Sequence, residues 1–257
     1  MAQLKRPGGE LATRPLHFIW MVDCSGSMYG EKIGAVNHAI QSTIPEMQDA
    51  ARNNPNAQLL VRTLKFSTGA SWVTANPVDI ESFAWDDLDA GGVTDLGKAF
   101  EMVAAQLTIP PMTDRALPPV IVLLSDGQPT DDYKKSLDKL LSLPWGKKAV
   151  RIAISIGQDA DDDVLQQFTG NRELVLQANN PEALVKMIKW ASTAASMVSA
   201  PASRVLEDKK PAGIPLLPAG DDLLPASVPA NGGGNAPLVL DMNNIPNPDD
   251  VGAGDVW

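Results

Sequence analysis

Apolar residues occur along this chain in two patterns, as short unbroken runs and as longer stripes with regular gaps. One run covers residues 17–22 and ends at Asp23, and another covers residues 119–124 and ends at Ser125 and Asp126. Unbroken runs of this length are typical of strands that are buried on both faces. The pattern therefore predicts two interior strands, each followed by a polar loop.

The gapped stripes predict helices. After the first run, apolar residues recur every three or four positions, at Ile33, Val36, Ile40, Ile44 and Met47. This spacing places them on one face of a helix. The same reasoning predicts strands at 59–66, 150–156 and 174–177, shorter extended pieces at 70–73 and 78–83, and helices near 96–107, up to 143, at 161–168 and at 181–197.

The alternation of strands and helices predicts an α/β fold with a central, mostly parallel sheet covered by helices on both faces. In such sheets, ligands bind at the carboxyl ends of the strands, near the point where the strand order reverses. Asp23 and Asp126 both follow strands directly. We therefore expect a functional site where these two strands end.

The chain divides into an N-terminal extension (1–14), the α/β domain (15–198) and a tail (199–257). The tail is rich in proline, glycine and alanine, and residues 201–257 carry three basic and eight acidic side chains, a net charge of -5. A segment of this composition buries too little apolar surface to order itself, so we predict that the tail is mostly disordered. Residues 237–257 regain apolar side chains and end in Trp257, which leaves open whether they are an inert end or a docking peptide.

Charge and cysteine content narrow the range of partners and compartments. The formal net charge of -10 argues against binding to nucleic acid or to anionic membranes and leaves basic or dipolar partners possible. Cys24 is the only cysteine, which excludes an internal disulfide and favours a reducing compartment. With no signal-peptide pattern and no long apolar span, we expect a cytoplasmic protein.

Candidate metal ligands lie in three loops at the ends of predicted elements. Asp23, Ser25 and Ser27 alternate after the first strand, so that their oxygens can face one point, while Thr94 precedes a helix and Asp126 follows a strand. Hydroxyls with one or two carboxylates suit hard cations such as Mg²⁺. Taken singly, each has a simpler explanation, because Thr94 could cap a helix and Asp126 could form a turn.

The three motifs D-x-S-x-S, G-G-x-T and S-D-G, in this order, resemble the von Willebrand factor A domain over residues 15–198. The resemblance implies a three-layer Rossmann-like fold and a complete metal-ion-dependent adhesion site (MIDAS) at Asp23, Ser25, Ser27, Thr94 and Asp126. It implies that Mg²⁺, or Mn²⁺ or Ca²⁺, is held mainly by the hydroxyls, with the aspartates often acting through water. The cation would keep one position open for an Asp or Glu carboxylate of a protein partner.

Four residues flank these loops and are candidates for a partner-binding rim: Met28, Tyr29, Asp95 and Gln128. Met28 and Tyr29 could instead pack beneath the following helix. The other acidic residues nearby are expected to be solvated or to stabilise helix N-termini.

Enzymatic functions fit the sequence poorly. A dehalogenase-like phosphatase would need a second carboxylate two residues after Asp23, where Ser25 stands. A serine hydrolase would need a nucleophile elbow and a late histidine, but the two histidines are His17 and His38. We therefore expect a binding protein and no catalysis.

Within the von Willebrand A family, the chain resembles the bacterial TerY or YegL-like group linked to tellurite resistance. The resemblance rests on residues 14–16, 30–33 and 124–130. It implies an adaptor or scaffold in a signalling or stress-resistance system with a Ser/Thr kinase and a PP2C-type phosphatase. The alternatives are a partner of an AAA+ ATPase, or a structural assembly module with no functional metal.

Overall fold

The computed structural model describes residues 13–54, 56–158 and 160–199. The predicted tail (199–257), its possible docking peptide (237–257) and the predicted extension (1–14) fall almost entirely outside these ranges. No helix in the described part of the chain combines the length and apolar character that a membrane span requires.

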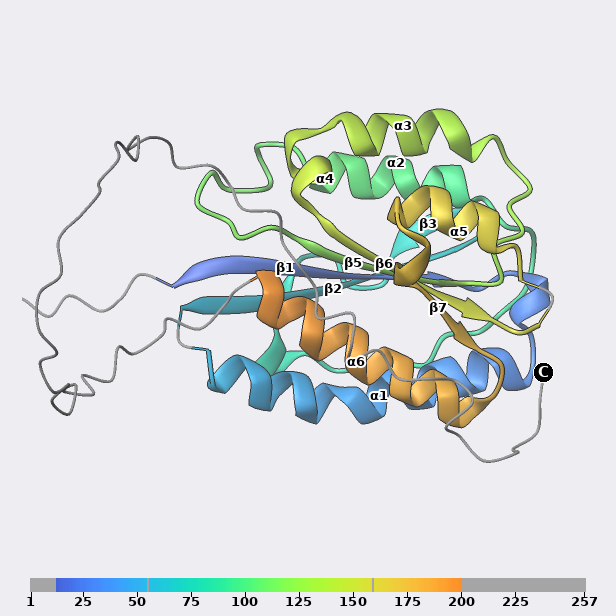
Figure 1. The fold of residues 1–257 in the computed structure, drawn as a ribbon, viewed down its shortest axis with the longest axis horizontal. Coiled ribbons are helices and arrows are strands. Elements are labelled where there is room, and N and C mark those ends of the chain that lie inside the picture. Colours follow the sequence, from blue (N-terminus) through green and yellow to red (C-terminus); the bar gives the residue numbers. More distant parts are fainter. Residues whose placement is uncertain (1–12, 55, 159, 200–257) are drawn as a thin grey trace, which may run out of the picture.

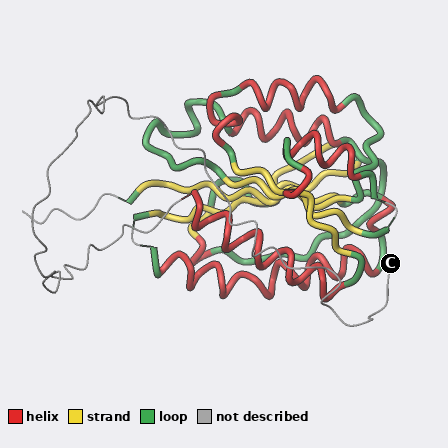
Figure 2. Tube along the Cα trace, in the orientation of Figure 1, coloured by secondary structure: helices red, strands yellow, loops and turns green. Residues whose placement is uncertain are grey.

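A seven-stranded sheet forms the centre of the domain, with helices on both faces (Figures 1 and 2). The strands are β1 Arg14–Asp23, β2 Ala57–Ser67, β3 Gly69–Trp72, β4 Val78–Asp79, β5 Val120–Ser125, β6 Val150–Ile156 and β7 Val175–Ala178. The helices are η1 Gly26–Met28, α1 Glu31–Arg52, η2 Ile80–Ser82, α2 Leu96–Gln106, α3 Tyr133–Ser142, α4 Pro144–Lys148, α5 Asp162–Thr169, η3 Arg172–Leu174 and α6 Pro181–Ser199.

The strand order is β3-β2-β1-β5-β6-β7, and β4 pairs with β2. β1 pairs in parallel with β2 on one side and with β5 on the other, and only β3 and β4 run antiparallel to their neighbour. The chain thus leaves β1 toward β2 and later returns to β1's other side. This is the point at which strand order reverses, and the loops after β1 and β5 meet there.

Two apolar cores lie on opposite faces of the sheet. On β1, Phe18, Trp20 and Val22 belong to the core beneath α1 and α6, whereas Ile19 and Met21 belong to the core beneath α2, α3 and α5. Both sets of β1 side chains are buried, which agrees with an unbroken apolar run. The predicted three-layer α/β fold is confirmed.

One local prediction needs correction, and one short helix was not predicted. The extended piece predicted at 78–83 is a two-residue strand, β4, followed by the 3₁₀ turn η2, because the Asp79 carboxylate accepts a hydrogen bond from the Glu81 amide and starts the turn. The helix predicted up to residue 143 is α3, which ends at Ser142, and the short helix α4, which begins at Pro144, lies beyond the predicted helix.

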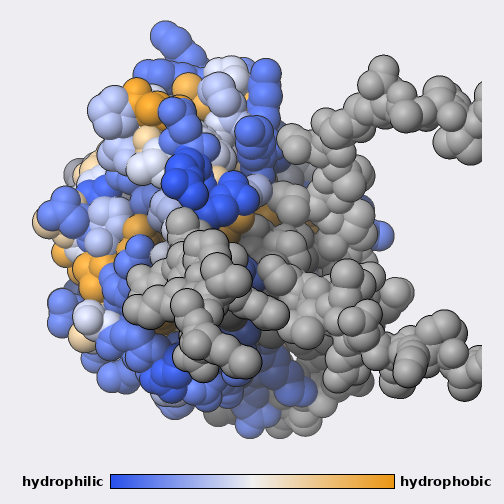
Figure 3. Space-filling model, turned by 90° about the vertical axis from the view of Figure 1, so that its left-hand side faces the viewer, coloured by the Kyte–Doolittle hydropathy of each residue, from blue (hydrophilic) through white to orange (hydrophobic). Residues whose placement is uncertain are grey.

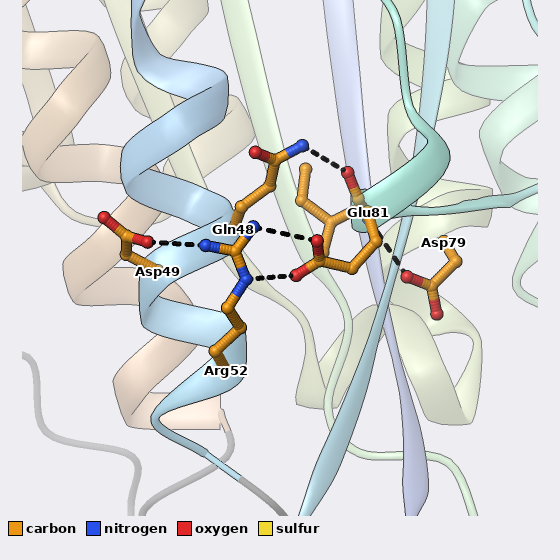
Figure 4. A network of polar contacts seen from close by, with 6 residues as sticks. Gln48, Asp49, Arg52, Asp79 and Glu81 are labelled. Carbon is orange, nitrogen blue, oxygen red and sulfur yellow. Dashed lines mark hydrogen bonds and ion pairs between the residues drawn. The ribbon is translucent and has the colours of Figure 1, made fainter.

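Side chains of helix α1 form hydrogen bonds with residues 80–88, which belong to the long segment between β4 and α2. Figure 4 shows how Arg52 of α1 donates two hydrogen bonds of 2.9 Å to Glu81, while Gln48 donates to the carbonyl of Ile80. Nearer the start of α1, the Asn37 amide donates to the Leu88 carbonyl at 2.9 Å and accepts from the Leu88 amide and from Trp85 Nε1. These bonds fix the segment just before residues 91–95.

Both ends of the described domain lie at the same end of the molecule, where the parallel strands begin. β1 starts there, and α6, which follows β7, starts where the strands end and runs back toward the beginning of β1 (Figure 1). The loops after β1 and β5 are therefore at the far end of the molecule from Arg14 and Ser199.

We expect Asn37→Ala to destabilise the domain and to loosen residues 88–94. Three hydrogen bonds to a partly buried amide are lost, at roughly 1 kcal/mol each, or about 2–3 kcal/mol in total. Denaturant unfolding measures the stability, and hydrogen exchange at 88–94 measures the loosening. Arg52→Ala, on the same helix, is the control, because its exposed ion pairs contribute little; equal effects of the two variants would contradict this role of Asn37.

Candidate metal centre

The Asp23 carboxylate joins the ends of β1 and β5. Its Oδ1 accepts from the Ser25 amide at 2.9 Å, and its Oδ2 accepts from the Ser125 hydroxyl at 2.6 Å. Ser125 can reach it because the register pairs Val22 with Leu124, so the next residues of both strands are neighbours. Asp23 and Ser125 are both fully buried. One oxygen of Asp23 therefore shapes its own loop, and the other connects two loops.

The two serines of the first loop have their hydroxyls together. Ser25 Oγ and Ser27 Oγ are 3.0 Å apart, and Ser25 is buried while Ser27 is exposed. The turn η1 brings them close, since it begins at Gly26 and returns the chain within three residues. Of the three alternate residues expected to face one point, the structure brings the hydroxyls of Ser25 and Ser27 together.

The second loop, which carries Thr94, is bonded to the first through its backbone. The Gly91 amide donates to the Cys24 carbonyl at 2.7 Å, and the Gly26 amide donates to the Gly92 carbonyl at 3.0 Å. Gly92 has a φ of 90°, and a Cβ there would collide with the Thr68 hydroxyl. Thr94 itself is buried. Glycine at position 92 thus lets the loop take a positive φ and lie against Thr68, and glycine at position 26 leaves room for the Gly92 carbonyl, which a Cβ there would approach to 3.2 Å.

The third loop, which carries Asp126, is bonded to the second. The Thr94 amide donates to the Thr130 hydroxyl at 3.1 Å, and the Thr130 amide donates to the Thr94 carbonyl at 2.9 Å. The Asp131 carboxylate accepts from the Gly97 and Lys98 amides and so caps α2. Each of the three loops is therefore hydrogen-bonded to the other two.

Asp126 has no hydrogen-bond partner for its side chain. Its backbone is fixed, because the Asp126 carbonyl accepts from the Asp161 amide at 2.7 Å. Yet both carboxylate oxygens are fully buried, and neither bonds to any other residue that the structure describes. Burying a carboxylate without a partner is costly, and a bound cation is one of the few groups that would offset that cost.

The donor set around Asp126 consists of oxygen atoms. Among the residues with described positions, no three histidine, cysteine or acidic side chains cluster as a metal site would require. The carboxylates of Asp23 and Asp126 belong to neighbouring strand ends, the hydroxyls of Ser25 and Ser27 lie in the loop that Asp23 begins, and backbone bonds hold the loop of Thr94 against both. This composition fits a hard divalent cation that keeps some water and does not fit the thiolate and imidazole sites typical of structural zinc.

Burial also determines the proton affinity of the site. It raises the pKa of Asp23 to about 6, and the nearby Asp126 carboxylate adds to that rise, whereas the hydrogen bonds from Ser125 and Ser25 oppose it. The same burial raises the pKa of the Cys24 thiol to about 12. Cys24 is therefore a buried, protonated side chain, as its apolar surroundings suggest.

The predicted rim residues have different positions. Met28 is fully buried in the core beneath α1, so its expected place on a partner-binding rim is wrong: the η1 turn points its side chain inward. Tyr29 is 78% exposed. Asp95 is half-buried, with its carboxylate accepting from the Gly69 amide at 2.8 Å, and Gln128 is exposed.

Most of the residues that hold the loops together could not be identified from the sequence. Ser125 was visible only as part of the S-D-G motif, and its bond to Asp23 depends on the pairing of β1 with β5. Thr130 and Asp131 resemble ordinary turn residues, and Asn37 lies on a helix far from the motifs. Of these, only Ser125 had a signal in the sequence, namely its place directly before Asp126.

We expect Asp23→Asn to stabilise the protein at pH 8 in the presence of a chelator. The folded-state pKa of about 6 lies above the usual 3.8, so ionising Asp23 as pH rises through this window destabilises the folded state, by roughly 3 kcal/mol above pH 7. An asparagine carries no charge, so this cost disappears. Urea unfolding at pH 8 and pH 5 measures the gain, which is smaller at pH 5.

Asp132→Asn removes the same charge from an exposed site nearby and serves as the control. A gain from Asp23→Asn that is equal at both pH values would show that the buried charge is not its cause.

Comparison with known proteins agrees with this architecture. The model of the von Willebrand factor type A domain matches residues 19–190. No curated protein sequence matches the chain. Several solved structures share the fold at low identity, which supports the fold alone.

Three of these structures illustrate the range. The ArnB paralog VWA2 from Sulfolobus acidocaldarius is 21% identical, with 68% of this chain and 44% of that chain covered and a TM-score of 0.50. The pilus adhesin SpaC from Lactobacillus rhamnosus GG, in an open conformation, is 16% identical, with 70% and 30% covered and a TM-score of 0.56. Proximal thread matrix protein 1 from the mussel byssus, with a zinc-occupied MIDAS motif, is 18% identical, with 73% and 49% covered and a TM-score of 0.54.

The chain spans less than half of the length of each of these three proteins. One family model nevertheless matches most of the described domain, over residues 19–190. The chain belongs to the von Willebrand factor type A domain family.

Proposed function

We propose that this chain is a metal-dependent protein-binding module. In this proposal, Asp23, Ser25, Ser27, Thr94 and Asp126 hold one divalent cation, and the cation binds an Asp or Glu carboxylate of a protein partner. The observation that carries the proposal is the buried Asp126 carboxylate, whose two oxygens have no partner among the described residues at the point where three loops meet. A cation there would supply the missing interaction.

The balance of charge favours an incoming anion. Two carboxylates carry a formal charge equal and opposite to that of a divalent cation. Asp23, however, already accepts two hydrogen bonds from the protein, so Asp126 is the carboxylate whose oxygens have no protein partner among the described residues. Hydroxyl groups add no negative charge. A cation in such surroundings stays electrophilic and favours a further carboxylate ligand.

Oxygen donors favour Mg²⁺, Mn²⁺ or Ca²⁺ as the bound ion. Zinc occupies the MIDAS motif of the mussel byssus protein, which supports a divalent cation in this fold but not a particular metal in this chain.

Binding without catalysis is part of the proposal. The residues that a serine hydrolase would need are far apart, because His17 is six residues before Asp23 on the same strand, a separation of about 20 Å. Burial, together with the positive charge of Arg62, lowers the pKa of His17, so it is a neutral core side chain. His38 lies on the exposed side of α1. Neither histidine is placed to activate Ser25 or Ser27.

The cellular setting stays a prediction. A Ser/Thr kinase with a PP2C-type phosphatase in a tellurite-resistance-like system, an AAA+ ATPase, and a purely structural assembly are each compatible with the described domain. Affinity capture from the native host, with and without EDTA, distinguishes them. A kinase and phosphatase favour the first, a hexameric ATPase the second, and capture that does not depend on metal favours the third.

We expect Asp126→Asn to weaken Mn²⁺ binding at least tenfold, because it removes the negative charge with the two unpartnered oxygens while keeping the size of the side chain. Isothermal titration of the full chain with Mn²⁺ measures the affinity. Asp132→Asn, which removes an exposed charge from the same loop, should bind Mn²⁺ as the unmodified chain does. Equal affinity of the two variants, or no Mn²⁺ binding by the unmodified chain, would refute the metal site.

A further inference from the structure

We propose that Tyr29 and Val93 form an apolar clasp around the metal site, and that the clasp selects a partner segment in which an acidic residue stands next to an apolar one and near basic ones. This inference rests on the proposed function and deepens it, since it concerns which carboxylates the site accepts. The term apolar clasp refers below to Tyr29 and Val93 together.

The exposure of these two side chains is unusual for the domain. Tyr29 is 78% exposed and Val93 is 46% exposed, and Ile109 is the only other large hydrophobic residue of the described chain with comparable exposure. Ile109 follows α2 toward the opposite end of the sheet. That end is mostly hydrophilic, with scattered apolar areas, where Figure 3 shows it. Tyr29 and Val93 are therefore the exposed large apolar side chains that the described chain carries on the loops of the proposed site.

Both members of the apolar clasp are beside proposed metal ligands. Tyr29 comes two residues after Ser27, and Val93 directly precedes Thr94. The hydrogen bond from the Gly26 amide to the Gly92 carbonyl, at 3.0 Å, holds the two loops side by side. The backbone of Tyr29 is fixed as well, because its amide donates to the Gly26 carbonyl. The two loops that carry the proposed ligands Ser27 and Thr94 therefore each carry one exposed apolar side chain beside the ligand.

The loops around the site carry only negative charge. Residues 24–30 contain no charged side chain, and every charged residue in 84–95 and 126–132 is an aspartate: Asp86, Asp87, Asp89, Asp95, Asp126, Asp131 and Asp132. Lys32, Lys65 and Lys98 stand just outside these loops, in α1, β2 and α2. Within the loops the fixed charge is negative, so apart from the cation they repel acidic segments and attract basic ones. The occupant that fits is a protein segment with one Asp or Glu for the cation, an apolar neighbour for the clasp, and lysine or arginine nearby.

The chain's own tail is the competing occupant. It has acidic and apolar residues, as in Asp255-Val256-Trp257, and its length would let it reach the site. Residues 201–257 nevertheless carry a net charge of -5, so the aspartates of the loops would repel it. Charge therefore favours a separate partner with basic residues.

The test uses the full-length chain and a random peptide display library, with binding in Mn²⁺ and elution by EDTA. We expect enriched peptides to share one Asp or Glu next to a leucine, isoleucine, valine or aromatic residue, with lysine or arginine within a few positions. A synthetic copy of the most enriched peptide should bind the Tyr29→Ser, Val93→Ser double variant at least tenfold more weakly. Ile109→Ser is the control and should bind the peptide as the unmodified chain does.

Mn²⁺ titration of the double variant distinguishes failure of the proposed metal site from failure of the apolar clasp. The double variant should bind Mn²⁺ with unchanged affinity, because neither residue is a proposed ligand. If the unmodified chain does not bind Mn²⁺, the proposed function fails. If it binds Mn²⁺ but yields no EDTA-eluted peptides, or only acidic peptides without an apolar neighbour, the clasp alone is refuted. Equal peptide binding by the double variant refutes the clasp as well.

A peptide of residues 237–257 added as a competitor decides the occupant. We expect it to leave the binding of the enriched peptide unchanged. Competition in Mn²⁺, together with binding of the 237–257 peptide itself that EDTA abolishes, would overturn the choice of a separate partner and identify the chain's own tail as the ligand.

Discussion

The hydrogen bond between the Ser125 hydroxyl and the Asp23 carboxylate is the contact on which the site depends. It joins the ends of the two central strands at the point where the strand order reverses. The other Asp23 oxygen shapes the loop that carries Ser25 and Ser27. This arrangement requires an ionisable group in the interior, and burial raises its pKa to about 6. In the metal-free domain this buried carboxylate therefore lowers stability, while its hydrogen bonds hold the loops in place.

The other loop contacts follow from this frame. Backbone bonds from Gly91 and Gly26 hold the second loop against the first, and the paired bonds between Thr94 and Thr130 hold the third against the second. Helix α1 starts just after the first loop and, through Asn37, fixes the segment that leads into the second. The loops are thus held in place by the protein itself, so that the proposed cation would bind to a site whose backbone is already preorganised.

Much of the fold could be predicted from the sequence, because unbroken apolar runs and gapped stripes mark buried strands and helices. The convergence of Ser25 and Ser27 could also be predicted, since alternate residues of one loop need no long-range information. The Ser125 bond could not, because it depends on the register between β1 and β5, which only tertiary packing sets. Met28 was misplaced because spacing alone does not reveal that a 3₁₀ turn points it into the core.

Arg14 and Ser199 lie at the same end of the sheet, where the parallel strands begin. This affects how the domain can be attached to other chains. A fusion partner joined at either of these residues starts from the pole opposite the loops (Figure 1). The loops therefore face away from Arg14 and Ser199. Fusion of a reporter or an immobilisation handle at either side should therefore preserve access to the loops, whereas an insertion within residues 84–95 would not.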